Sequence, residues 1–203
     1  MNVYIIFSAT PNKLGRFIRT VTAEDYNHVS IAFSEEPQTM YSFGRRYYQT
    51  PLWGGFVAET PERYHSGKRS AEIVICCLPV EQPQYQKLKD TLKIIEANKE
   101  RYLYNHLSAI VAPLHCRLQP KNAYTCAEFC AHILGQLGFL ENDTKFYSIS
   151  ALMQNLKPYE VYEGIMPTDG QARSDYFQKW SAIKALRLTA RDFFALFGRL
   201  RRA

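Results

Sequence analysis

The sequence predicts an α+β fold in which an antiparallel sheet packs against a cysteine-bearing helix and a basic helix ends the chain. Short apolar runs rich in β-branched and aromatic residues fill roughly the first 80 positions, as strands do. Apolar residues at helical spacing dominate the remainder, and strands followed by helices are typical of this class. The 203 residues are 46% hydrophobic and 22% charged, which excludes disordered and fibrous proteins.

Strands account for most of the first part of the chain. A short helix at 12–20 interrupts them, because Leu14, Phe17 and Ile18 recur at positions i, i+3 and i+4 behind a Thr-Pro-Asn turn. The run at 71–78 is strongly apolar, so we expect it near the centre of the sheet. The predicted strands cover 3–7, 28–33, 39–43, 56–59 and 71–78.

Helices follow the last predicted strand. Gly138 is expected to end one of them and Ser148 to cap the next. The predicted helices cover 83–99, 105–111, 125–137, 148–156 and 173–202. We therefore expect one domain at 1–160, followed by a linker and a basic amphipathic helix at 161–203.

The net charge of +6 comes from the C-terminal segment. Residues 176–203 contain seven Lys or Arg and one Asp, whereas the residues before them contain 18 basic and 18 acidic side chains. A neutral main domain lacks the basic surface that nucleic acids require, so we expect no nucleic-acid partner.

The basic tail has two interpretations. Its apolar residues recur at roughly helical spacing, and they are Trp180, Ile183, Leu186, Phe193, Phe194, Phe197 and Leu200. A basic amphipathic helix of this kind can lie on an anionic membrane surface. Alternatively, the helix docks on the domain through its aromatic face and keeps its charges solvated. The aromatic bulk favours docking, because a surface normally leaves less apolar area exposed.

The sequence also predicts the cellular compartment. It shows no export signal and no apolar run long enough to span a membrane. It contains five cysteines, an odd number, at 76, 77, 116, 126 and 130. We therefore expect free thiols and a cytoplasmic protein, peripheral to a membrane if the tail binds lipid.

The sharpest local motif begins at Thr125. Thr125 and Glu128 form the Thr-x-x-Glu pattern of a capping box ahead of an apolar run. This places Cys126 at the first helical position, where the positive end of the helix dipole stabilises a thiolate. Since the thiolate is the nucleophilic form, Cys126 is a candidate nucleophile. The alternative is a small buried cysteine that packs under the helix.

A nucleophilic cysteine needs a base, and His28 is the strongest candidate among the five histidines. It opens a predicted strand and shares one face of that strand with Ser30 and Ala32, whose small side chains leave room for a helix. The alternative is a histidine that only satisfies a strand end.

Three motifs together resemble the circularly permuted papain-like hydrolases of the NlpC-type superfamily, which includes the lecithin:retinol acyltransferase-like proteins. In that group the His strand precedes the Cys helix, which is the order found here. The resemblance covers roughly residues 3–156 and implies that Cys126 and His28 are catalytic. The motifs are Tyr26-Asn27-His28-Val29-Ser30-Ile31, Tyr41-Ser42-Phe43-Gly44 and Tyr124-Thr125-Cys126-Ala127-Glu128-Phe129.

The family's third site residue is a polar side chain on the strand after the His strand, where it orients the imidazole. A hairpin turning near Glu35 would set residue 28 roughly opposite residue 43, so that Ser42 or Gly44 lies close to His28. We therefore expect Ser42 to accept the imidazole N–H, although serine is a weaker orienter than the His, Asn or Glu of the family. Glu59, on the next predicted strand, is the rival for this role.

The resemblance implies a thiol hydrolase or acyltransferase that acts on an amide or ester. A small peptide, another amide or a lipid acyl group would be the substrate, and no cofactor is needed. A zinc site drawn from Cys126, Cys130 and His132 does not have zinc-ribbon spacing, so no metal is expected. The alternative function is a non-catalytic binding module or membrane-associated adaptor on the same fold, with a structural Cys126.

Overall fold

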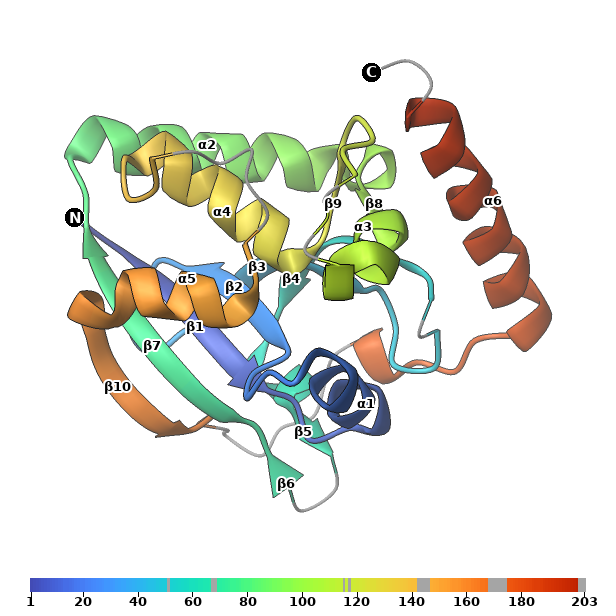
Figure 1. The fold of residues 1–203 in the computed structure, drawn as a ribbon, viewed down its shortest axis with the longest axis horizontal. Helices are drawn as coiled ribbons and strands as arrows, with labels where there is room; N and C mark the ends of the chain where they lie inside the picture. The colour runs from blue at the N-terminus through green and yellow to red at the C-terminus, as the bar shows by residue number, and fades with distance from the viewer. Residues whose placement is uncertain are drawn as a thin grey trace.

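The computed structural model is a mixed α+β structure with a largely antiparallel sheet (Figure 1). It describes residues 1–50, 52–66, 69–114, 116, 118–141, 147–167 and 175–200. The strands are β1 (Asn2–Ala9), β2 (His28–Ala32), β3 (Met40–Arg45), β4 (Gly54–Glu59), β5 (His65–Ser66), β6 (Arg69–Ser70), β7 (Glu72–Pro79), β8 (Leu103–Tyr104), β9 (Ala123–Tyr124) and β10 (Glu160–Ile165). The helices are α1 (Lys13–Thr22), α2 (Gln82–Ala97), α3 (His106–Val111), α4 (Cys126–Leu137), α5 (Ile149–Leu156) and α6 (Ala182–Leu200).

The main sheet has the strand order β10-β7-β1-β2-β3-β4-β8-β9. Neighbouring strands run antiparallel except for the short β8–β9 pair. All five predicted strands are confirmed within a few residues. The expectation that the run at 71–78 lies near the centre of the sheet is wrong, because β7 is the second strand from one edge, between β10 and β1. Its apolar run instead reflects two covered faces, one in each core. The two-residue strands β5, β6, β8 and β9 and the edge strand β10 were not predicted.

Strand β1 is apolar along its length because both of its faces are covered. Val3, Ile5 and Phe7 point into the main core, while Ile6 belongs to a second core on the other face of the sheet. All four side chains are fully buried. A run of consecutive apolar residues therefore marks a strand with two packed faces rather than one solvated face.

Helices α2, α4 and α5 cover the same face of the sheet and bury their apolar sides in the main core (Figure 1). Helix α4 packs against β2 and β3. Gly138 ends α4 in the left-handed conformation with φ of 83°, as the sequence predicts, because glycine adopts this conformation without steric cost. The packing of α4 sets where its N-terminus, and with it Cys126, meets the sheet.

The C-terminal region is joined more closely to the main domain than the sequence predicts. The domain boundary expected at residue 160 falls on the first residue of β10, which pairs with β7 in the main sheet. Helix α6 begins at Ala182, nine residues after the start expected at 173, and part of the intervening segment lies outside the described residues. Among the described helices, none has the length and apolar character needed to cross a membrane.

Helix α6 is docked on the domain. The indole Nε1 of Trp53 donates a hydrogen bond of 3.0 Å to the Asp192 carboxylate, and Leu196 is fully buried beside Leu103 and Leu107. The expected aromatic docking face is only partly right, since Phe194 is 75% exposed. Leu196, Asp192 and the partly buried Phe193 face the domain, whereas Phe194 does not.

The docking of α6 predicts a clear difference between two truncations on that helix. Leu196→Ala should lower the free energy of unfolding by about 2 to 5 kcal/mol, because it leaves a cavity in a fully buried position. Phe194→Ala, the matched exposed control, should change it by less than about 0.5 kcal/mol. Urea denaturation followed by circular dichroism measures both, and equal effects would show that α6 is not docked in this register.

Candidate active site

Cys126 is the first residue of α4, and the predicted capping box is confirmed. The Thr125 hydroxyl accepts a hydrogen bond of 3.2 Å from the Glu128 backbone N–H, and the Glu128 carboxylate accepts one of 2.7 Å from the Thr125 N–H. These reciprocal bonds fix the start of the helix. The backbone N–H groups of the first turn therefore surround the Cys126 side chain with positive potential.

A buried asparagine supports this helix start. The Asn105 amide nitrogen donates to the Glu128 carboxylate at 3.1 Å and to the carbonyl of Leu118 at 2.7 Å. Asn105 itself is fully buried and caps α3 by accepting from the Ser108 N–H. The capping box is thus tied to the neighbouring helix, which restricts the movement of Cys126. The sequence indicated Asn105 only as a helix start.

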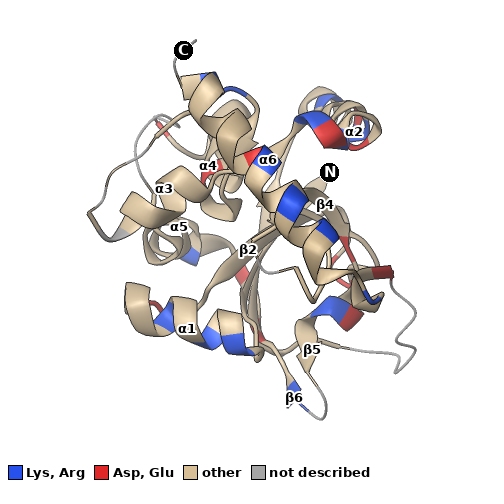
Figure 2. Ribbon diagram, turned by 90° about the vertical axis from the view of Figure 1, so that its right-hand side faces the viewer, with Lys and Arg blue, Asp and Glu red and all other residues tan. Residues whose placement is uncertain are grey.

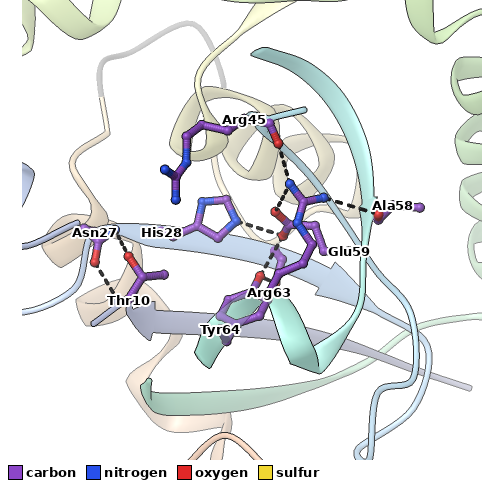
Figure 3. Close-up of polar contacts among 9 residues, drawn as sticks. Thr10, Asn27, His28, Arg45, Ala58, Glu59, Arg63 and Tyr64 are labelled. Carbon is purple, nitrogen blue, oxygen red and sulfur yellow. Dashed lines mark hydrogen bonds and ion pairs between the residues drawn. The ribbon is translucent and has the colours of Figure 1, made fainter. Parts of the chain in front are cut away.

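His28 and Glu59 form a buried ion pair (Figure 3). The distance between His28 Nε2 and Glu59 Oε2 is 2.9 Å. Burial by itself lowers the pKa of His28, but the Glu59 carboxylate and hydrogen bonds with Cys126 and Glu59 outweigh burial and raise the pKa to about 10. The imidazole is therefore held in its protonated form over the neutral pH range.

Two further side chains stabilise the Glu59 carboxylate. The Tyr64 hydroxyl donates to Oε2 at 2.6 Å, and an Arg63 guanidinium nitrogen lies 3.9 Å from Oε1. Burial raises the pKa of Glu59, but the charges of His28 and Arg63 and these hydrogen bonds lower it to about 2. Glu59 is consequently ionised in the folded protein, and its charge is compensated on two sides.

The expectation that Ser42 orients His28 is wrong, and the rival residue Glu59 occupies that position. Strands β2 and β3 pair with Ile31 opposite Tyr41, a register one residue away from the expected one. Continued to the start of β2, this register sets His28 opposite Gly44. Ser42 Oγ is buried and has no hydrogen-bond partner in the described part of the chain.

Gly44 provides the space through which Glu59 reaches His28. A side-chain Cβ at Gly44 would lie 3.3 Å from Glu59 Oε1 and 3.5 Å from His28 Cε1. Both distances are close to the contact limit, so any larger side chain would displace one member of the pair. The motif at Tyr41–Gly44 therefore contributes to the site through its glycine and not through its serine.

His28 and Cys126 line the same cleft, which has a volume of about 200 Å³. The interaction of His28 with Cys126 is among the causes of the raised pKa of His28. The structure thus brings together Cys126 and His28, the two candidate residues that the sequence suggested. Nucleophilic catalysis by cysteine requires a thiol near an imidazole that a third group orients.

A second histidine, His106, lines the same cleft, which the sequence did not suggest. Burial lowers the pKa of His106, and its ring packs at a tilt of 48° against Tyr104 with 4.9 Å between centroids. The described residues include no carboxylate paired with His106. His28 is the better base because it contacts both Cys126 and a carboxylate.

The other described thiols lack this environment. Burial raises the pKa of Cys76 to about 12 and raises that of Cys130 as well. Cys116 is exposed, and His115 beside it lies outside the described residues. Over the described ranges, no group of three or more His, Cys, Asp or Glu is placed to hold a metal ion.

Comparisons with known proteins give no assignment. No protein-family model matches the chain. Neither the curated proteins nor the solved structures include a significant match. Any function must therefore be argued from the site itself.

The His28–Glu59 pair predicts how alkylation of Cys126 responds to substitution. In Glu59→Gln, the charge that raises the pKa of His28 is removed and burial lowers that pKa, so Cys126 loses a cationic neighbour. The rate of iodoacetamide labelling of Cys126 at pH 6 should fall about tenfold or more, and the midpoint of its pH profile should move to higher pH. Peptide mass spectrometry measures both quantities.

Ser42→Ala is the matched control for Glu59→Gln, because both residues are buried on neighbouring strands. Its labelling rate should stay within about twofold of the parent protein, since the Ser42 hydroxyl makes no hydrogen bond in the described structure. If Ser42→Ala changed the pH profile as much as Glu59→Gln, the assignment of Glu59 as the orienting residue would be wrong.

Proposed function

We propose that this chain is a thiol hydrolase or acyltransferase of the permuted papain-like type, with Cys126 as nucleophile, His28 as base and Glu59 as the orienting carboxylate. The observation that carries the proposal is the His28 ring, which pairs with Glu59, interacts with Cys126 and lines the same cleft as Cys126. A merely structural cysteine would not need a buried, charged imidazole beside a helix N-terminus.

The proposed reaction forms a thioester on Cys126. The Cys126 thiolate attacks the carbonyl carbon of an amide or ester, and the carbonyl oxygen becomes an oxyanion near the backbone N–H groups that begin α4. The bond to the leaving nitrogen or oxygen breaks as the protonated His28 donates its proton to that atom. Neutral His28 then takes a proton from water, or from another acceptor, which attacks the thioester and frees Cys126.

The order of the elements supports the same family assignment. The strand that carries His28 precedes the helix that carries Cys126, and the sheet between them is antiparallel, as the resemblance implies. The proposed substrate is a small peptide, another amide or a lipid acyl group. The proposed setting is the cytoplasm, where recycled peptides and lipid precursors are both present.

The catalytic assignment predicts the behaviour of two variants. Cys126→Ala and His28→Ala should each reduce Cys126-dependent turnover of an amide or ester by about a thousandfold or more. The double variant should be little worse than either single variant, because residues that act as one unit do not lose activity additively. Circular dichroism should show an unchanged fold, and normal turnover by His28→Ala would eliminate His28 as the base.

Thiol reactivity provides a test that needs no substrate. Cys126 should react with iodoacetamide at pH 6 faster than any other thiol, including the exposed Cys116. Peptide mass spectrometry of the briefly labelled protein separates the sites. Faster labelling of Cys116 at this pH would contradict the nucleophile assignment and favour the non-catalytic alternative.

A second candidate function is peripheral binding to an anionic membrane, and the outer face of α6 supports it. Ile183 and Leu186 are 67% and 70% exposed although the helix is docked through its other side. Lys184 and Arg187 lie between and beside them, and Figure 2 shows basic residues along this helix. Exposed apolar side chains next to cations are typical of an interfacial helix. Docking and membrane binding are therefore compatible here.

This candidate predicts salt-sensitive co-sedimentation of the full chain with vesicles that contain anionic lipid. The double variant Ile183→Ser/Leu186→Ser should bind about tenfold more weakly, because it loses two apolar contacts with the membrane. Ile94→Ser, which alters an equally exposed isoleucine on α2, is the control and should bind normally. Raising the salt concentration should weaken binding, and absence of binding by the parent chain would exclude this role.

A further inference from the structure

Cys126 lies where two hollows meet. The first is the cleft that contains His28 and Glu59. The second is a groove of about 370 Å³ between α1, α3 and the start of α5. Ile18, Asn27, Tyr104, Ala109 and Cys126 line both of them. A molecule attacked by Cys126 can therefore extend in two directions from the reacting carbonyl.

The groove between α1, α3 and the start of α5 is mainly apolar. Phe17 and Val21 on α1 form one wall, and Ala109 and Ala112 form the other. Phe17 and Val21 are 65% and 53% exposed, which is unusual for large apolar side chains that face a groove beside a reactive thiol. A bound apolar group would remove these side chains from water. His28, Glu59 and Arg45 do not line this groove.

The cleft that contains His28 also contains the cation Arg45, which pairs with no carboxylate of the described residues. Arg45 lines the cleft, and its guanidinium donates one hydrogen bond to the Tyr48 carbonyl at 3.2 Å. In the described part of the chain no carboxylate pairs with it, whereas Arg63 beside it is occupied by Glu59 and two carbonyl groups. In the view of Figure 3, the end of the Arg45 side chain lies on the side of the His28 ring away from Glu59.

The direction of proton transfer determines which part of the substrate lies in the cleft and which part lies in the groove. His28 must donate its proton to the leaving atom, so the leaving group lies on the His28 side, in the cleft with Arg45. The acyl part, which stays on Cys126 as a thioester, then extends into the groove lined by α1 and α3. Resting on the proposed function, we infer that the substrate joins an apolar acyl group to a leaving group that carries an anion bound by Arg45.

Protection of Cys126 from iodoacetamide tests this inference on the full chain without requiring turnover. The probes are N-octanoylglycine, its neutral analogue N-octanoylglycinamide, the short N-acetylglycine, and a phosphonate analogue of N-octanoylglycine. N-octanoylglycine should protect at about tenfold lower concentration than the glycinamide, because a charge-assisted hydrogen bond to Arg45 is lost in the latter. It should also protect Cys126 at a concentration about tenfold or more below that needed for N-acetylglycine, because the octanoyl chain buries more apolar surface in the groove. The phosphonate shows whether Arg45 prefers a carboxylate or a phosphate-like anion.

Matched variants test whether the preference for a charged probe arises in the cleft and the preference for a long acyl chain arises in the groove. Arg45→Gln should abolish the preference for N-octanoylglycine over its glycinamide, whereas Arg16→Gln on α1, which lines neither hollow, should preserve it. Ala112→Trp should fill the groove and abolish the preference for octanoyl over acetyl. Ile110→Trp, two residues earlier on α3 and outside the groove, should preserve that preference.

The outcomes separate this inference from the proposed function. Equal protection by charged and neutral probes, equal protection by long and short probes, or no protection at all would overturn the inference, and Cys126 would remain a candidate nucleophile. If Cys126 is not the fastest-reacting thiol before any probe is added, the proposed function itself fails.

Discussion

The ion pair of His28 and Glu59 is buried between strands, and the geometry of the site depends on it. Each charge alone would be costly to bury, since neither would keep its hydration. The pair is tolerated because Tyr64 and Arg63 complete the environment of the carboxylate and His28 also interacts with Cys126. Removing one partner would leave an uncompensated buried charge, so the pair acts as a unit.

Cys126 and His28 are held in place by different kinds of structure. His28 is fixed by its place at the start of β2, whereas Cys126 is fixed by the capping box of α4 and by Asn105 behind it. The packing of α4 on β2 and β3 determines how these two positions meet. The same core that stabilises the fold therefore sets the relation between thiol and imidazole.

The C-terminal region contributes to the site from outside the main sheet. Tyr176, which follows the last undescribed segment before α6, lines the cleft and lies with its ring 4.0 Å from the Arg63 guanidinium. Its carbonyl accepts a hydrogen bond of 2.8 Å from the Tyr48 N–H. Because α6 is anchored through Trp53, Asp192 and Leu196, the segment before it is held against the mouth of the cleft. The tail thus completes the cleft and also presents the exposed outer face of α6.

The choice of Cys126 and His28 as partners came from the resemblance to permuted papain-like hydrolases. The sequence alone determined the α+β class, the five main strands and the capping box. These features depend on local patterns, namely apolar periodicity, turn residues and the spacing of helix caps. It did not determine the strand register, because a shift of one residue in a hairpin leaves the apolar pattern almost as convincing but exchanges Ser42 for Gly44 beside His28.

Only the tertiary structure decided that Glu59 pairs with His28, that Asn105 supports the helix start, and that Tyr176 and Arg45 line the cleft. These residues lie on separate segments, and their contacts arise from sheet order and from the docking of α6. A sequence records each residue's neighbours along the chain. Which distant residues share a cleft follows from the packing of whole elements, and no local pattern encodes it.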